Sequence, residues 1–347
     1  MKNLFLFSTV ILLAITGCRE DKKQPDTSGV KIELTVQHFE KDFFALDTSR
    51  IEEGLSALRI KYPVFYQDFL EQILGIPAND STGMAMMAIR QFLNDYRPIK
   101  AEADKAISDF SPIETELKKG LANVKYYFPE YALPNKLITF IGPMDAYAEG
   151  QTGGYGDIIT TDALGVGLQL HLGAASFYYT SEMGQRLYPS YISRRFTPEY
   201  IPVNSIKNII DDLYPGMPND KTLLDIMIDK GKRLYLLEKF LPDTPDTLRI
   251  GYTQNQLEGA EKNEGMIWNF FVENNLLYET DQQKIKSYVG DGPKTNELGD
   301  GSPGYISLFT GRAIVRKYME NFPETDLKQM LQLDAKTILN ESKYKPR

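Results

Sequence analysis

Cys18 is the only cysteine in this chain of 347 residues. A protein with a single cysteine has no intramolecular disulfide, so its folded state depends on a buried apolar core. Hydrophobic residues make up 42% of the sequence, which is enough to build such a core. The length suits one large domain or two modest ones. The chain must therefore fold through packing alone.

The segment before Cys18 has the layout of a secretory signal. Lys2 supplies a positive charge, Leu4 to Thr16 form a mainly apolar run, and small residues precede the cysteine. The run is too short for the roughly 20 residues of a membrane-spanning helix. Its cysteine ending resembles bacterial lipoprotein signals, which implies cleavage after Gly17, a diacylglyceryl thioether on Cys18 and acylation of the new amino terminus. Residues 1–17 are the predicted lipoprotein signal peptide.

Residues 18–31 are the predicted lipidated cysteine and a polar tether. Arg19 to Lys31 contain no large hydrophobe before Val30, which is typical of a solvated spacer. The acidic residues directly after Cys18 resemble surface-export signals of some lipoproteins, and a plain polar spacer is the alternative. The sequence thus predicts a membrane-anchored lipoprotein of the cell envelope and does not choose between the inner and the outer membrane. Residues 32–347 are the predicted globular domain.

The charge of the chain excludes one class of partner. The formal net charge is −8, and no basic run or basic patch with interleaved aromatic residues offsets it. An acidic chain of this kind repels phosphate backbones, so nucleic-acid binding is not expected. The same acidity opposes electrostatic adhesion to anionic lipids and leaves membrane attachment to the acyl chains.

Periodicity predicts a mainly helical protein with a small sheet. Alternating apolar residues predict strands over 32–38, 137–141 and 157–161, the last continuing through Leu170. No internal repeat is found. The predicted fold class is α+β, a predominantly helical single globular domain with a small β-sheet. Apolar residues at helical spacing predict helices within these ranges: 51–58, 65–73, 84–96, 100–124, 206–213, 223–241 and 257–271.

Two Ser-Pro pairs are predicted helix starts. Ser111-Pro112 breaks the helical region 100–124. Ser302-Pro303 is expected to open the last clear helix, with the serine as N-cap and the proline at the first helical position. Isoleucines 206, 209 and 210 and Leu213 follow the spacing i, i+3, i+4, i+7 and are expected to be buried.

Motifs for nucleophilic or phosphate chemistry are weak. The segment Gly150 to Asp157, GQTGGYGD, lacks the Lys-Ser/Thr of a P-loop and does not fit the dinucleotide fingerprint, so a wide turn between strands is predicted. His38 and His171 are the only histidines, and each lies in a strand-like segment without a Gly-x-Ser-x-Gly context. A catalytic group that uses a histidine base is not expected.

Carboxylates are abundant, so close pairs arise by chance. Asp211 and Asp212 are adjacent and point to different sides of a helix, whereas Asp225 and Asp229 share one face. A glycosidase would need two carboxylates across a cleft. A solvated helix face is the preferred interpretation of this pair, and no calcium-binding loop spacing is present.

Besides the lipoprotein signal, four long segments carry a family resemblance: YPSYISRRFTPEYIPVNSIKNIIDDLY (188–214), LLDIMIDKGKRLYLLEKFLPDTPD (223–246), GYTQNQLEGAEKNEGMIWNFF (251–271) and SPGYISLFTGRAIVRKYM (302–319). They resemble the GldB family of gliding-motility-associated lipoproteins. The resemblance implies an envelope lipoprotein connected with gliding motility and its allied protein-secretion machinery, without an established enzymatic activity. Because homologues also occur in bacteria that do not glide, the resemblance does not by itself prove a motility role.

A more distant resemblance is to zinc peptidases that carry a His-Glu-x-x-His helix followed by a helix beginning Glu-Gly. On that register Asn204, Ser205 and Asn208 stand where the two histidines and the catalytic glutamate belong, and Lys230 stands at the downstream glutamate. Amides are weak zinc ligands and an ammonium opposes a dication. The resemblance implies a degenerate zincin-like scaffold that has lost its metal, with no cofactor and no catalytic residue.

Three functions follow as hypotheses. The first is a non-catalytic lipoprotein that supports a motility or secretion apparatus through contacts with other cell-envelope proteins. The second is a metal-independent hydrolase that uses carboxylates across a deep cleft. The third is a ligand- or glycan-binding lipoprotein with an exposed aromatic groove at Tyr188, Tyr191 and Tyr200. Arg194 and Arg195 are candidates for a carboxylate contact with a partner, and structural ion pairs are the alternative.

Overall fold

The computed structural model describes residues 24–77, 83–145, 156–160, 163–216 and 221–346. The predicted signal peptide, Cys18 and most of the Gly150–Asp157 turn lie outside these residues. Within them, one cluster of buried apolar residues extends from Leu34 to Tyr344, so the described part of the chain packs around a single core. None of its helices is long and apolar enough to cross a membrane.

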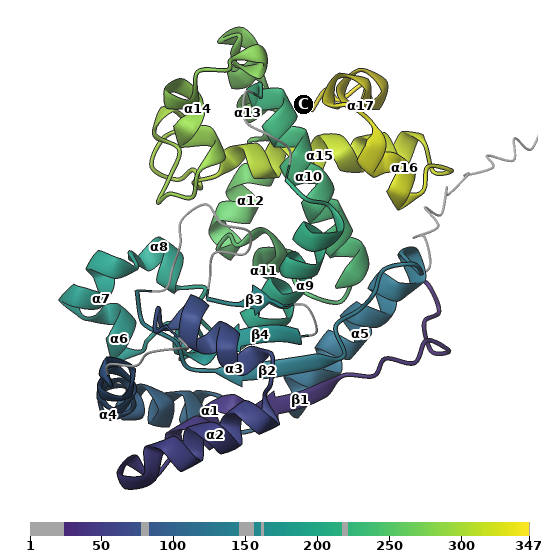
Figure 1. Cartoon of the computed structure of the whole chain (residues 1–347). Coiled ribbons are helices and arrows are strands. Elements are labelled where there is room, and N and C mark those ends of the chain that lie inside the picture. Colours follow the sequence, from purple (N-terminus) through teal and green to yellow (C-terminus); the bar gives the residue numbers. More distant parts are fainter. Residues whose placement is uncertain (1–23, 78–82, 146–155, 161–162, 217–220, 347) are drawn as a thin grey trace, which may run out of the picture.

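A four-stranded sheet lies near the middle of the molecule in the order β1-β2-β4-β3 (Figure 1). Its strands are β1 (Thr35–His38), β2 (Lys136–Phe140), β3 (Ile158–Ile159) and β4 (Ala163–Gly167). β1 and β4 flank β2 in parallel, while β3 runs antiparallel to β4 at the other edge. Buried residues fill β2 and β4, as expected for strands covered on both faces.

The first four helices of the amino-terminal half lie on one side of the sheet (Figure 1). Phe39, Phe43, Phe65 and Phe69 form an aromatic cluster there, with ring centroids 4.7 to 6.1 Å apart. These rings hold the short helices against β2 through Phe140. The helices of this group are α1 (Phe39–Phe44), α2 (Ile51–Lys61), α3 (Phe65–Asp68) with a following π-turn (Phe69–Ile73) and α4 (Met84–Ala106). α5 (Ser111–Tyr127) instead packs against helices of the second half of the chain, because Gly120 lies against Ile206 and Leu241.

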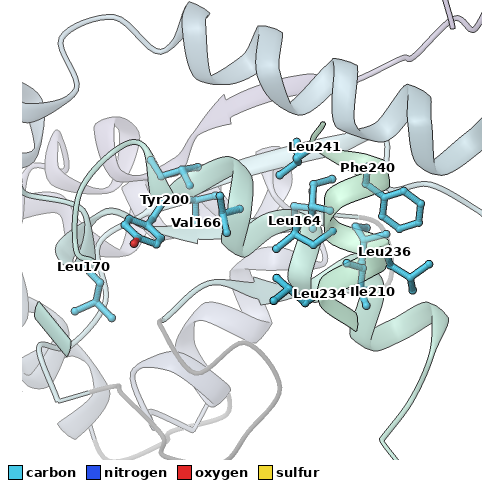
Figure 2. Close-up of a cluster of buried hydrophobic side chains, with 14 of the residues drawn as sticks. Leu164, Val166, Leu170, Tyr200, Ile210, Leu234, Leu236, Phe240 and Leu241 are labelled. Atoms are coloured by element: carbon cyan, nitrogen blue, oxygen red, sulfur yellow. The ribbon is translucent and has the colours of Figure 1, made fainter. Parts of the chain in front are cut away.

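The other side of the sheet carries α9 (Tyr200–Leu213) and α10 (Leu223–Phe240), reached through α6 (Phe177–Thr180), α7 (Glu182–Leu187) and α8 (Ser190–Ser193). Figure 2 shows Leu164 of β4 beside Ile210 of α9 and Leu236 of α10, and Val166 of β4 beside Tyr200 at the start of α9. All five side chains are buried. This contact between sheet and helices is the part of the core that positions the polar face of α9.

The remaining helices form an upper layer around α10 (Figure 1). They are α11 (Asp246–Ile250), α12 (Gln254–Lys262), α13 (Glu264–Glu273), α14 (Gln282–Val289), α15 (Ile306–Asn321), α16 (Leu327–Gln332) and α17 (Ala335–Ser342). α10 and α15 pack with their backbones in contact, because Gly231 and Gly311 face each other. A Cβ on Gly231 would lie 2.3 Å from the carbonyl oxygen of Gly311.

The predicted fold class, a predominantly helical α+β domain with a small sheet, is confirmed, and so are most of the predicted elements. The opening strand is shorter than predicted and begins at Thr35. α4 runs through Pro98 as one helix instead of two segments. Ser111-Pro112 does begin α5. Isoleucines 206, 209 and 210 are at most 1% exposed, while Leu213 is only partly buried.

Two predicted elements are wrong. The single strand predicted from 157 through Leu170 is instead two antiparallel strands, β3 and β4. β4 ends at Gly167, and in the 3-10 turn Leu168–Leu170 that follows, the Gln169 side chain accepts a hydrogen bond from the Gly142 amide. Ser302 does not cap the late helix, because its hydroxyl is bound to the backbone of Thr295. α15 begins at Ile306 after Tyr305, which adopts a left-handed conformation, and α16 and α17 follow it.

Candidate functional site, the buried polar face of α9

α9 combines an apolar face with a polar face that is also buried. Ile206 and Ile209 are fully buried, and Ile206 packs against Gly120 of α5, whose absent Cβ would lie 3.1 Å from it. Asn204, Ser205 and Asn208 are 4%, 1% and 4% exposed. Buried polar side chains are costly unless they are hydrogen-bonded, so the partners of these three decide what the face does.

Asp157 organises the first part of the polar face. It directly precedes the edge strand β3 and is 4% exposed. Asn204 Nδ2 donates to Asp157 Oδ2 over 3.2 Å, and the Gly167 amide donates to Asp157 Oδ1 over 3.0 Å. His171 Nε2 lies 3.1 Å from Asp157 Oδ2. One carboxylate thus joins the sheet edge, the turn after β4 and α9.

Both ring nitrogens of His171 face acceptors. Nδ1 lies 3.1 Å from the Thr197 carbonyl oxygen, and Nε2 lies against Asp157. A carbonyl oxygen only accepts, so Nδ1 carries a hydrogen. The second contact then requires one further proton, either on Nε2 or on the carboxyl group. With either placement of that proton, both ring nitrogens are bonded within the fold. Neither nitrogen is left to act as a base toward a nucleophile.

Ser205 and Asn208 have no comparable role. Ser205 Oγ and Asn208 Nδ2 are buried and have no hydrogen-bond partner within the described part of the chain. Among the described residues, no group of three or more His, Cys, Asp or Glu side chains is placed to hold a metal ion. Lys230, the fourth position singled out by the peptidase resemblance, lies on α10 beside Tyr305, whose phenol group raises the pKa of Lys230. That the protein holds no metal stays a prediction, which elemental analysis would test.

The second histidine lies at the opposite edge of the sheet. His38 ends β1, whereas Asp157 precedes β3. His38 Nδ1 lies 2.9 Å from Thr139 Oγ1, which donates to the buried Glu40 over 2.6 Å. His38 and Glu40 border a cavity of about 270 Å³ at the start of α5. The structure therefore does not bring the two histidines together.

The predicted aromatic groove is not formed by Tyr188 and Tyr200. Tyr188 is 1% exposed and stacks edge-on against Phe196, with ring centroids 4.9 Å apart. Tyr200 is 7% exposed at the start of α9. Only Tyr191 is partly accessible. Tyr188 and Tyr200 are core residues that fix the approach to α9.

The two arginines before α9 make internal contacts. Arg194 donates to the Gly251 carbonyl oxygen over 2.7 Å and to Gln256 over 3.1 Å. Arg195 forms an ion pair with Asp291, in the segment after α14. Of the two interpretations of these arginines, a structural ion pair is the one that holds for Arg195.

The predicted carboxylate face also has internal partners. Asp225 completes the capping box of α10 with Thr222. Asp229 and Asp211 both bind Arg233, the former over 3.0 Å to the guanidinium Nε. Asp212 accepts from the Tyr131 hydroxyl over 2.6 Å. The solvated-face interpretation of the pair Asp225 and Asp229 is therefore wrong for Asp229, whose carboxylate is bound by Arg233 of the same helix. Asp211 is the carboxylate through which α9 is held to α10.

Sequence reasoning missed three residues of this region. Asp157 and Gln169 are buried polar groups whose partners come from other segments of the chain. Lys207 is half-buried on α9. The one local signal is that Lys207 and Asp211 lie at i and i+4 on the face of α9 opposite its buried isoleucines. Asp157 and Gln169 lie beside predicted strands. The alternation of apolar and polar residues there suggested only structural roles.

Comparisons with known proteins agree with the resemblance seen in the sequence. The family described as gliding motility protein GldB matches residues 20–346, which is nearly the whole chain. No curated protein and no solved structure shows significant similarity. The more distant resemblance to zinc peptidases gains no support from these comparisons. On the strength of the match over residues 20–346, the chain belongs to the GldB family of gliding motility proteins.

Proposed function

We propose that this protein is a non-catalytic lipoprotein of the cell envelope, anchored through Cys18, that supports gliding motility or the allied protein-secretion machinery through contacts with other envelope proteins. Membership of the GldB family supports the motility context. The observation that carries the non-catalytic part is the bonding of His171, because both of its ring nitrogens are used inside the fold.

The carboxylates of the same region support the proposal in a second way. A hydrolase needs a general acid and a general base that reach the substrate. Asp157 is bound by three groups of the fold, and Asp211 and Asp229 are bound by Arg233. Carboxylates held in this way stabilise the packing of α9 and are poorly placed to exchange protons with a substrate.

Replacing Ser205 and Asn208 by alanine tests the non-catalytic role. Ser205 Oγ and Asn208 Nδ2 make no hydrogen bond, so their loss is expected to cost the fold little. Cells that produce Ser205→Ala/Asn208→Ala in place of the native protein should keep normal protein abundance and normal spreading on agar. Arg195→Ala is the matched contrast, because it breaks a partly buried ion pair and should lower protein abundance.

The outcome that would overturn the proposal is loss of spreading by Ser205→Ala/Asn208→Ala at normal abundance, since that would make the polar face itself active. The proposed contacts with other envelope proteins need a separate measurement. Crosslinking in intact gliding cells, followed by mass spectrometry, should join the protein to components of the motility or secretion apparatus. Crosslinks confined to unrelated envelope proteins would contradict it.

A further inference from the structure

A cavity of about 380 Å³ lies between α15, the junction of α12 and α13, and the segment that follows α17. One of its walls is a single face of α15, because Phe309, Arg312 and Arg316 stand at positions i, i+3 and i+7. Another wall includes Tyr344, whose hydroxyl donates to Glu264 of α13 over 2.6 Å. Three parts of the fold that are separate in sequence therefore enclose this cavity.

The two arginines of this cavity are held by the same two carboxylates. Glu238 of α10 accepts from Arg312 Nε over 2.5 Å and from Arg316 Nε over 2.9 Å, through its two different oxygens. Asp246 Oδ2 accepts from the Nη2 atoms of both arginines, 3.4 Å away in the case of Arg316. Shared carboxylates of this kind fix the two guanidinium groups beside each other.

The remaining edge of each guanidinium carries Nη1. Nε and Nη2 share one edge of the planar group, and in both arginines that edge binds Glu238 and Asp246. Neither Nη1 has a hydrogen-bond partner among the residues that the structure describes. Both arginines border the cavity whereas the two carboxylates do not, so the geometry directs the Nη1 donors toward the cavity. Arg312 is only 3% exposed, and a hydrogen bond to a charged group is strong where water is largely excluded.

Positive charge is in excess around the cavity. Cations outnumber carboxylates by five to three among the side chains that line it. Lys317 pairs with Glu320 over 3.3 Å. Lys343 and Lys345 are exposed, and in the described part of the chain neither has a carboxylate within 4.0 Å. A chain with a formal net charge of −8 thus gathers cations at one cavity, where their field attracts an anion.

We infer that this cavity binds a carboxylate that is attached to an apolar group. The two Nη1 donors lie side by side and match the two oxygens of one planar carboxylate. The three carboxylates in the lining oppose the second charge of a phosphate dianion and favour a monoanion. Phe309, Ala313 and Pro346 offer apolar surface to the rest of the ligand. This inference goes beyond the proposed function and does not rest on it, because it concerns binding by the purified protein.

A ligand of this chemistry has two sources, the carboxyl-terminal residue of a polypeptide and a free organic acid. Fluorescence anisotropy separates them. The full mature protein in non-ionic detergent is titrated into the tripeptide Gly-Ser-Leu, which carries a neutral fluorophore at its amino terminus and a free carboxyl terminus. The same tripeptide with an amidated carboxyl terminus is the matched ligand without charge, and Gly-Ser-Gly with a free carboxyl terminus lacks the apolar side chain. Unlabelled 4-methylpentanoate and inorganic phosphate are added as competitors.

The free-acid Gly-Ser-Leu should bind saturably and at least about tenfold more tightly than its amide, and Gly-Ser-Gly should bind more weakly. Displacement by 4-methylpentanoate at concentrations near the Kd of the peptide identifies a free organic acid as sufficient. Displacement only at far higher concentrations identifies the polypeptide source. The inference is overturned by equal affinity for the amide, by no binding of the free-acid peptide, or by stronger displacement with phosphate than with 4-methylpentanoate.

Two variants locate the ligand in this cavity. Arg316→Lys keeps the charge but loses the Nη1 donor, so it should weaken binding of the free-acid peptide by at least about fivefold. Arg186→Lys is the matched control, because the Arg186 side chain is 70% exposed on α7, and it should leave the affinity unchanged. Each variant is accepted only with an unchanged thermal transition. Lys345→Gln alters an exposed side chain, should weaken binding by about twofold, and keeps the test open if Arg316→Lys does not fold. Parental affinity in the folded variants of Arg316 and Lys345 would overturn the inference and leave the envelope role untouched.

Discussion

At the scale of single residues, charged side chains are buried where backbone or side-chain groups bind them. Lys232 of α10 is 3% exposed, and its ammonium donates to the carbonyl oxygens of Leu331 and Leu333 over 3.0 and 2.6 Å. These are carbonyls at the end of α16, which lack partners within their own helix. One lysine thus connects α10 to the carboxyl-terminal helices.

Lys232 makes stability depend on pH in a defined direction. Burial lowers its pKa from 10.5 to about 8. Between these values the unfolded chain holds a proton that the folded chain has released, so unfolding takes up a proton and stability rises with pH. Lys207 acts in the same direction. Lys232→Met should therefore reduce the rise in the free energy of unfolding between pH 8 and 9.5 by up to about 1.4 kcal/mol per pH unit.

Urea unfolding at several pH values measures this slope. Lys105→Met provides the control, because Lys105 is exposed on the surface of α4. A slope for Lys232→Met equal to that of the parent would show that the amine is not desolvated in the native state.

At the scale of elements, the contact between α10 and α15 depends on glycine. A Cβ on Gly311 would lie 1.8 Å from the carbonyl oxygen of Met227, a backbone atom that cannot rotate away. Gly311→Ala should therefore separate the two helices and lower the free energy of unfolding by roughly 1–3 kcal/mol or more. Gly259→Ala in α12 meets nothing within 4 Å and should raise it by about 0.5–1 kcal/mol. The denaturant midpoints of Gly311→Ala and Gly259→Ala test these two expectations, and equal shifts of the midpoint would contradict them.

The apolar face of α9 allows a second test at this scale. Ile206 is fully buried against α5, so Ile206→Ala should leave a cavity and cost roughly 2–5 kcal/mol. Ile60 of α2 is 82% exposed, and the same substitution there should change stability by less than about 0.5 kcal/mol. Urea unfolding of both variants decides whether α9 is anchored as described. A small loss for Ile206→Ala would mean that the site can collapse around the smaller side chain.

The sequence predicted elements well where the signal was local. The isoleucines of α9 and the Ser111-Pro112 start of α5 are patterns within a few residues, and both appear in the structure. The predicted N-cap at Ser302 is wrong because the Ser302 hydroxyl donates to the Thr295 carbonyl oxygen. The helix-start pattern does not encode this contact. The polar cluster of Asp157, His171 and Asn204 brings together three segments that are distant in sequence, so neither composition nor periodicity could assemble it.

At the scale of the whole molecule, attachment to the membrane is predicted to depend on Cys18. The described residues contain no helix able to span a membrane, and acyl chains add roughly 0.8 kcal/mol per buried methylene. Cys18→Ala should move the protein from the membrane fraction to the soluble fraction of lysed cells. A second variant, with residues 1–18 replaced by a signal that is cleaved without lipid attachment, removes the apolar segment as well. Retention of this second variant in washed membranes at the level of the parent would contradict the lipid anchor.

The parallel pairing of β1 with β2 sets an order of events during export and folding. His38 and Thr139, which are hydrogen-bonded neighbours across this pair, are 101 positions apart. On the export route that the predicted signal implies, the chain emerges amino terminus first, so β1 has no strand partner until α1 to α5 have followed it. Closing a loop of this size is slow because its entropy must be lost before the strand contacts form. Until β2 arrives, the free edge of β1 is therefore a segment that a chaperone has reason to cover.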